Sequence, residues 1–198
     1  MVVPFKTRVK LILEECALDY LHNFIEKKYI LYSRHFTKHI YYTIDAKKDN
    51  YLHLTGVKTA LRAGVFFDKC ITRTLQESDF DLGDKSRKGS IRKKIKVLKT
   101  AVNLFDGTHL IDAEERFIKN KVVCSFATSD GTCTLGFILE KNSKPLTLLK
   151  GNELSHSHPV ELIIEKDSDD SFVSRVILNI HNHSMSEILD LLAGKIVM

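Results

Sequence analysis

Apolar residues in the first half of the chain recur mostly at the three- and four-residue spacing of amphipathic helices. This spacing predicts helices over Val9 to Tyr29, Val57 to Leu75 and Ile91 to Phe105. The third helix has a continuous apolar stripe, which indicates that one of its faces packs into the core. That stripe consists of Ile91, Ile95, Leu98, Val102 and Phe105.

Between the helices the residues favour extended chain and turns. His39 to Ile44 is rich in aromatic and β-branched residues and is predicted as a strand. Asp45 to Asn50 is a polar turn, and Tyr51 to Leu54 is interpreted as extended or loop chain ahead of Gly56. Ser78 to Gly89 is a second polar connection.

After residue 106 the pattern becomes strand-like. Asp130-Gly131 lies between two β-rich runs, Phe117 to Phe126 and Thr132 to Glu140, and indicates a hairpin. Ser186 to Leu192 is predicted as a short closing helix with Ser186 as its N-cap. Three further strands are predicted over Pro145 to Leu149, Val160 to Glu165 and Phe172 to Ile180.

Helices followed by strands favour an α+β fold with an antiparallel sheet. No internal repeat, low-complexity tract or Pro-rich linker divides the chain. We therefore expect a single domain over residues 1–198, with a helical part over about 1–106 and a sheet part over about 107–198.

The composition is that of a soluble globular protein, with 43% hydrophobic and 28% charged residues among 198. No apolar run is long enough to cross a bilayer, and the N-terminus lacks a signal-peptide pattern, so a cytoplasmic location is expected. The four cysteines form no CxxC pair, which favours buried free thiols in a reducing compartment.

The charge is unevenly distributed around a formal net value of +5. Lys85 to Lys99 holds eight basic residues and no acidic one. Such a cluster is either an electrostatic footprint for phosphate or a solvated helix face, and the sequence leaves both interpretations open.

One short run, Asn50 to Lys58, combines a histidine, a hydroxyl, a turn glycine and a lysine. These are groups that bind and cleave a phosphodiester without a metal. This run occurs together with other short elements in the same order along the chain. As a set, they make the chain resemble the fourth phage-associated family of barnase–EndoU–colicin–RelE-like nucleases, over roughly residues 10 to 180. The matching elements are Cys16-Ala17 with Tyr20, Tyr29, a strand ending near Ile44, the stretch from Tyr51 to Val57, Phe66 to Cys70, Thr134 to Phe137 and Pro145 to Leu149.

The resemblance implies a BECR fold, in which N-terminal helices pack on a small antiparallel sheet, as in barnase and RelE. It also implies an RNA-cleaving activity in a phage, prophage or related mobile element. Membership of a fold group does not by itself establish activity, because such folds also carry inactive sites.

Metal-independent RNA cleavage needs a base for the 2′-hydroxyl proton, an acid for the leaving oxygen and a cation for the phosphorane. His53 is the candidate acid/base, because histidine titrates near neutrality; its alternative is a structural turn histidine. Thr55 either donates to a phosphate oxygen or caps a helix that begins near Val57. Lys58, in the first turn of that helix, completes the candidate catalytic set.

Further basic residues along the chain are expected to bind phosphate groups of the substrate. Arg62 follows Lys58 by one turn, Lys69 and Arg73 are four apart, and Lys93 and Lys94 lie in the basic cluster. Thr147 matches a polar position of the family. The alternatives are solvated side chains for the bases and an ordinary strand residue for Thr147.

Two histidine pairs, His156 with His158 and His181 with His183, have the spacing at which a strand presents both rings on one face. No Cys or Asp completes a known zinc spacing, so no metal or other cofactor is expected. Glycine-rich phosphate loops, GxSxG and HExxH are absent, which excludes kinase, hydrolase and metalloprotease motifs.

The sequence therefore predicts a ribonuclease that acts by 2′-hydroxyl transesterification, with RNA as partner, no membrane association, and an antitoxin, immunity or host protein as a further partner. The alternative is a phage protein without catalytic activity that binds nucleic acid or a host protein.

Overall fold

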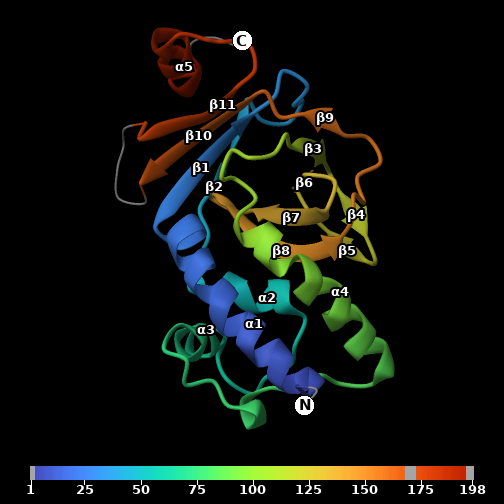
Figure 1. Cartoon of the computed structure of the whole chain (residues 1–198). Coiled ribbons are helices and arrows are strands. Elements are labelled where there is room, and N and C mark those ends of the chain that lie inside the picture. Colours follow the sequence, from blue (N-terminus) through green and yellow to red (C-terminus); the bar gives the residue numbers. More distant parts are fainter. Residues whose placement is uncertain (1–2, 168–172, 195–198) are drawn as a thin grey trace.

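The computed structural model describes residues 3–167 and 173–194 as an α+β fold built on a large curled sheet. In the sheet the strands lie in the order β11-β10-β1-β2-β8-β7-β6-β3-β9 (Figure 1). Their bounds are β1 (Lys27–Tyr32), β2 (Tyr41–Ile44), β3 (Asp112–Glu115), β6 (Phe126–Ser129), β7 (Cys133–Leu139), β8 (Ser143–Lys150), β9 (His158–Pro159), β10 (Leu162–Asp167) and β11 (Arg175–Asn179). A separate hairpin joins β4 (Ile118–Lys119) to β5 (Val122–Val123).

The sheet is larger than expected and is mixed. Ile44 of β2 pairs in parallel with Ser143 of β8, and every other pairing in the described sheet is antiparallel. This contact joins the β1–β2 hairpin to the β6–β7–β8 meander. The expectation of a small antiparallel sheet is corrected, because strands distant in sequence extend the sheet on both sides of the meander.

Four helices gather at one end of the sheet (Figure 1). They are α1 (Phe5–Tyr20), α2 (Tyr51–Thr55), α3 (Ala63–Ile71) and α4 (Lys85–Val102), and α5 (Met185–Leu192) lies at the opposite end. A π-helical turn, Leu21–Ile25, follows α1, and short 3₁₀ turns cover Lys48–Asn50 and Glu77–Asp79.

Several predicted element boundaries were wrong. The first helix gives way to β1 at Lys27, and the stretch from Tyr51 to Leu54 is helical because Tyr51 and Leu54, three residues apart, both turn into the core. The helix predicted from Val57 begins only at Ala63. The basic helix starts earlier than predicted, at Lys85, and α5 is capped by Ser184 rather than Ser186.

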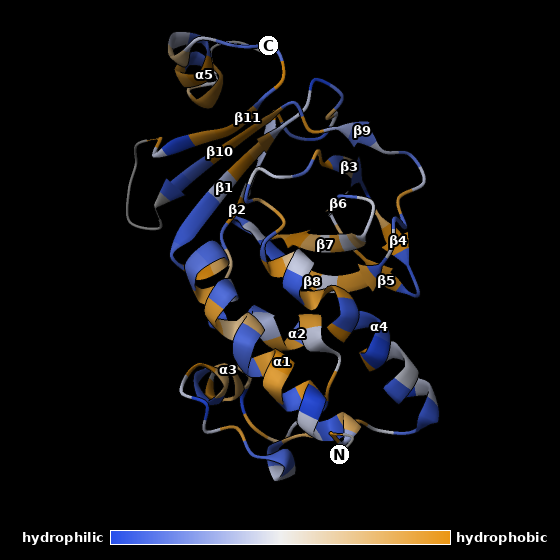
Figure 2. Cartoon of the chain, in the orientation of Figure 1, coloured by the Kyte–Doolittle hydropathy of each residue, from blue (hydrophilic) through white to orange (hydrophobic). Residues whose placement is uncertain are grey.

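The core joins the helices to one face of the sheet. Figure 2 shows the apolar positions of α1, β7 and β8 in orange. Phe105, Phe126 and Phe137 are fully or almost fully buried there. A second cluster packs α5 through Ile188 and Leu191 against β1 and β10. The predicted Asp130-Gly131 turn is confirmed between β6 and β7, with Gly131 at a φ of 90°. The strand before it is β6 and not the predicted Phe117 to Phe126, because that stretch forms the separate β4–β5 hairpin.

The prediction of buried free cysteines is also confirmed. Burial raises the pKa of the Cys16, Cys70 and Cys133 thiols to about 12 and that of Cys124 to about 11. Among the described helices, none combines the length and apolar character that a membrane span requires.

Candidate nucleic-acid groove

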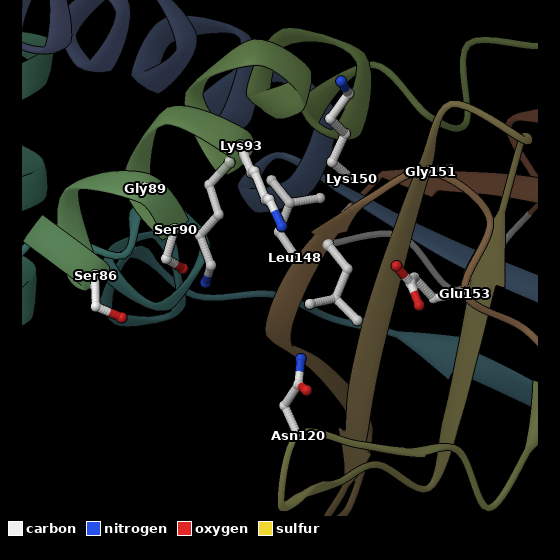
Figure 3. Close-up of a pocket in the computed structure, with 11 residues that line it drawn as sticks. Ser86, Gly89, Ser90, Lys93, Asn120, Leu148, Lys150, Gly151 and Glu153 are labelled. Carbon is white, nitrogen blue, oxygen red and sulfur yellow. The ribbon is translucent and has the colours of Figure 1, made fainter.

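A groove of about 640 Å³ separates α4 from the end of β8 (Figure 3). Its lining combines ammonium groups, hydroxyls, an amide and a carboxylate with two leucines. The residues are Ser86, Gly89, Ser90, Lys93, Lys94, Asn120, Leu148, Leu149, Lys150, Gly151 and Glu153.

One wall is the N-terminal half of α4, which Asp84 caps by accepting the backbone N–H of Arg87 (2.8 Å). Ser86, Ser90 and Lys93 follow each other at helical spacing, so their side chains share the face that Figure 3 shows toward the groove. The opposite face of α4, including Ile91, is buried in the core. The sequence of α4 therefore presents polar groups on one side and buries the other.

The other wall comes from β8 and the chain after it, with Asn120 contributed by the β4–β5 turn. Glu153 is paired with Lys119 (2.7 Å), so its negative charge is compensated. Within the described residues, neither Lys93 nor Lys150 has a carboxylate partner. The groove therefore has a net positive charge that suits an anionic chain.

The stretch from His53 to Gly56 is attached directly to the basic helix. The Nζ of Lys94 donates to the His53 carbonyl (2.9 Å), and the Nε of Arg87 donates to the Gly56 carbonyl (3.2 Å). These carbonyls lie at the end of α2, where the helix leaves acceptors unsatisfied.

Glycine is required where the two segments meet. Gly56 has a φ of 76°, which side chains disfavour, and a Cβ on it would lie 3.0 Å from the Cδ of Lys94. The close approach of α2 to Lys94 therefore depends on this glycine.

Lys94 differs chemically from its exposed neighbours. Burial, assisted by the nearby charge of Arg87, lowers the pKa of Lys94 from 10.5 to about 8. An amine with such a pKa is still mostly protonated at neutral pH but exchanges its proton readily there.

The predicted catalytic residues are only partly brought together. His53 is exposed, and its ring has no hydrogen-bond partner in the part of the chain that the structure describes. Thr55 is fully buried: its hydroxyl donates to the Leu52 carbonyl (2.8 Å) and accepts the Val57 N–H (3.3 Å). It closes α2 and does not cap the next helix.

Lys58 lies in no helix and does not line the groove. Its backbone pairs with Asp81, and its side chain borders a separate hollow of about 460 Å³ with Asp79 and Asp81. Two acidic neighbours make that hollow a poor site for phosphate.

Three of the other predicted bases also lie away from the groove. Lys69 is paired with Asp79 (2.9 Å), which lowers the pKa of that carboxyl. Arg62 is exposed just before α3. Arg73 lies beyond the end of α3 with a φ of 56°, so it does not share a helix face with Lys69.

Of the predicted substrate-binding residues, Lys93 and Lys94 line the groove, whereas Thr147 does not. Thr147 is buried in β8 opposite Gly136, which lacks a side chain that would collide with its methyl group.

Other groove residues were not anticipated. The helical spacing of Ser86, Ser90 and Lys93 is a signal that was present in the sequence. Nothing in the sequence places Asn120, Lys150 or Glu153 beside α4, because that contact depends on the sheet.

The histidine pairs do not form a metal centre within residues 3–167 and 173–194. No group of three or more His, Cys, Asp or Glu side chains is arranged there to hold an ion.

A family model described as phage-Barnase-EndoU-ColicinE5/D-RelE like nuclease4 matches residues 12–179. This range includes all of α2, α4 and β8. No curated protein and no solved structure matches the chain.

Proposed function

Because the chain belongs to the phage-Barnase-EndoU-ColicinE5/D-RelE like nuclease4 family, we propose that it cleaves RNA in the groove between α4 and β8. The observation that carries this proposal is the attachment of Lys94, an amine with a lowered pKa, to the residue His53. Lys94 lines the positively charged groove, and its bond to the backbone carbonyl of His53 supports His53 as the acid/base that acts beside it.

The proposed reaction is an internal transesterification. The 2′-oxygen attacks the adjacent phosphorus, the bond from phosphorus to the 5′-oxygen breaks, and a 2′,3′-cyclic phosphate and a 5′-hydroxyl result. His53 takes the proton of the 2′-hydroxyl, and the Lys94 ammonium gives a proton to the leaving 5′-oxygen. In this proposal Lys94 replaces Lys58 as the catalytic cation.

Lys94 also suits the charge that develops on phosphorus. One of its N–H groups is held by the His53 carbonyl, which leaves two for a phosphate oxygen. Partial burial strengthens such an interaction, because less water screens it.

Lys93 and Lys150 lie on opposite walls and bind the phosphates on either side of the cleaved bond. The lining contains no aromatic side chain on which a base would stack, so the backbone of the RNA is the main recognition element. RNA of any sequence is then expected to enter the groove.

The test is incubation of the purified protein with structured RNA in EDTA, followed by mapping of the product ends. Wild type should leave 2′,3′-cyclic phosphates, and RNA with a 2′-deoxy substitution at each cleavage site should remain intact. His53→Ala should lose cleavage, whereas His22→Ala, which removes another exposed histidine outside the groove, should keep it.

Variants of the groove lysines distinguish RNA binding from RNA cleavage. Lys93→Gln and Lys150→Gln should each reduce the salt dependence of RNA affinity by about one counterion. If RNA binds with this dependence but no product forms, the chain is a binding protein without catalysis. If His53→Ala cleaves like wild type, the catalytic assignment is wrong.

A further inference from the structure

At the end of the molecule opposite α3, where β9 and β11 lie (Figure 1), the ring of His35 stacks on that of His158, with ring centres 4.5 Å apart. The loop after β1, the start of β10 and the turn after β11 meet there. The backbone N–H of Glu161 donates to the Tyr32 carbonyl (2.9 Å), and the Glu161 carbonyl accepts the backbone N–H of Ile180 (3.0 Å). The histidines carried by these segments and by β9 are His35, His39, His158, His181 and His183.

Glu161 anchors this end of the sheet. Its side chain is only 6% exposed and accepts the Nε (2.7 Å) and the backbone N–H (2.9 Å) of Arg34. Burial acts to raise the pKa of Glu161, but these hydrogen bonds and the contact with His181 lower it. The carboxylate therefore stays charged and holds the Arg34 guanidinium in one orientation.

His181 contacts both members of this ion pair. Its Nε2 lies 3.2 Å from a Glu161 oxygen and within hydrogen-bond distance of an Nη of Arg34. In the neutral tautomer that carries its proton on Nδ1, this nitrogen accepts from Arg34. In the protonated ring it is a donor, so it turns to Glu161 and leaves the Arg34 N–H without an acceptor.

Protonation also changes the charge at this point. The described groups that face His181 are Arg34 from the loop, Glu161 from the start of β10 and His183, whose ring centre is 5.7 Å away. When His181 is protonated, the two cations Arg34 and His181 share the single negative charge of Glu161. One positive charge and an oriented N–H donor are then free to bind an anion.

A hollow of about 210 Å³ lies beside Arg34, lined also by Lys38 and His39. The nearby carboxylate of Glu115 is already occupied, because it accepts N–H groups from Thr37 and Lys38 and the hydroxyl of Tyr42. Arg34 and Lys38 thus supply positive charge to the hollow, and a tetrahedral oxyanion matches the fork of an arginine.

We propose that Arg34 and His181 form an anion site for a phosphate group, separate from the groove, that fills when His181 is protonated. Its ligand is free phosphate or a phosphodiester of a nucleic acid. The site does not depend on catalysis at His53.

The test uses sulfate as the probe, because its charge is constant between about pH 6 and pH 8. Histidine resonances of the full chain are followed by NMR during a pH titration, with and without sulfate, at matched ionic strength in chloride. Since binding and protonation are linked reciprocally, sulfate should raise the titration midpoint of His181. His22, which is paired with Glu26, is the internal control.

Sulfate affinity should be about tenfold higher at pH 6 than at pH 8 in wild type, and this difference should disappear in His181→Asn. A 2′-O-methyl oligoribonucleotide, which 2′-attack cannot cleave, distinguishes the two ligand sources. A selective shift of His181 with sulfate and the oligonucleotide indicates a nucleic-acid phosphate, and a shift with sulfate alone indicates a small anion. If neither probe moves His181 more than His22, the proposal is overturned whether or not RNA is cleaved in the groove.

Discussion

Replacing Lys94 by Met tests the electrostatic basis of the groove. Methionine keeps much of the length and volume of the side chain but removes the amine. In the folded protein burial lowers the pKa of this amine from 10.5 to about 8. A pKa difference of that size corresponds to roughly 3 kcal/mol. Where Lys94 is charged in both the folded and the unfolded chain, the free energy of unfolding of wild type is lower by this amount.

The sign follows from proton binding. Between about pH 8 and pH 10.5 the unfolded chain holds a proton on Lys94 that the folded chain has released, so the stability of wild type rises with pH through this window. Below about pH 8 the full penalty applies. From pH 7.5 to pH 9.5 wild type should therefore gain about 2 kcal/mol relative to Lys94→Met.

The assay is urea unfolding followed by circular dichroism at a series of pH values. Subtracting the free energies of unfolding of the two proteins at each pH removes the contribution of all other titrating groups. The lost hydrogen bond to the His53 carbonyl adds an offset that does not vary with pH. Lys93→Met is the matched control, because it removes an exposed ammonium from the next position and keeps the Lys94 amine, so it should retain the gain in stability that Lys94→Met loses. Parallel stability profiles for wild type and Lys94→Met would refute the assignment of Lys94 as a buried, easily deprotonated amine.

Three further outcomes are expected. Gly56→Ala should lower the free energy of unfolding by about 1–2 kcal/mol, measured in urea, because its left-handed φ disfavours a side chain and the new Cβ would press on Lys94; an unchanged midpoint would contradict this. Asp84→Ala should cost about 1 kcal/mol through loss of the α4 cap, whereas Asp106→Ala in an exposed loop should cost less. The four thiols should not react with a disulfide reagent at pH 8 in the native protein, because burial raises their pKa values to about 11 or 12. All four should react in denaturant. Fast reaction of the native protein would show that the core opens.

Local patterns were enough to predict some elements. The Asp130-Gly131 turn needs only a glycine between two β-rich runs, and the apolar stripe from Ile91 to Val102 needs only helical spacing. The clustering of bases on the same helix was equally visible. These features depend on neighbours within a few residues, which is the range over which backbone and side-chain preferences act.

The tertiary structure decided which of the bases face an open groove. Lys69 and Lys94 look alike in the sequence, but folding pairs Lys69 with Asp79 and places Lys94 against the end of α2. The parallel contact of β2 with β8 joins residues 99 positions apart, and the contact of Arg34 with Glu161 joins residues 127 positions apart. Spacing along the chain carries no information on such pairs, because the partner of a strand edge or a charged group is whichever distant segment packing brings to it.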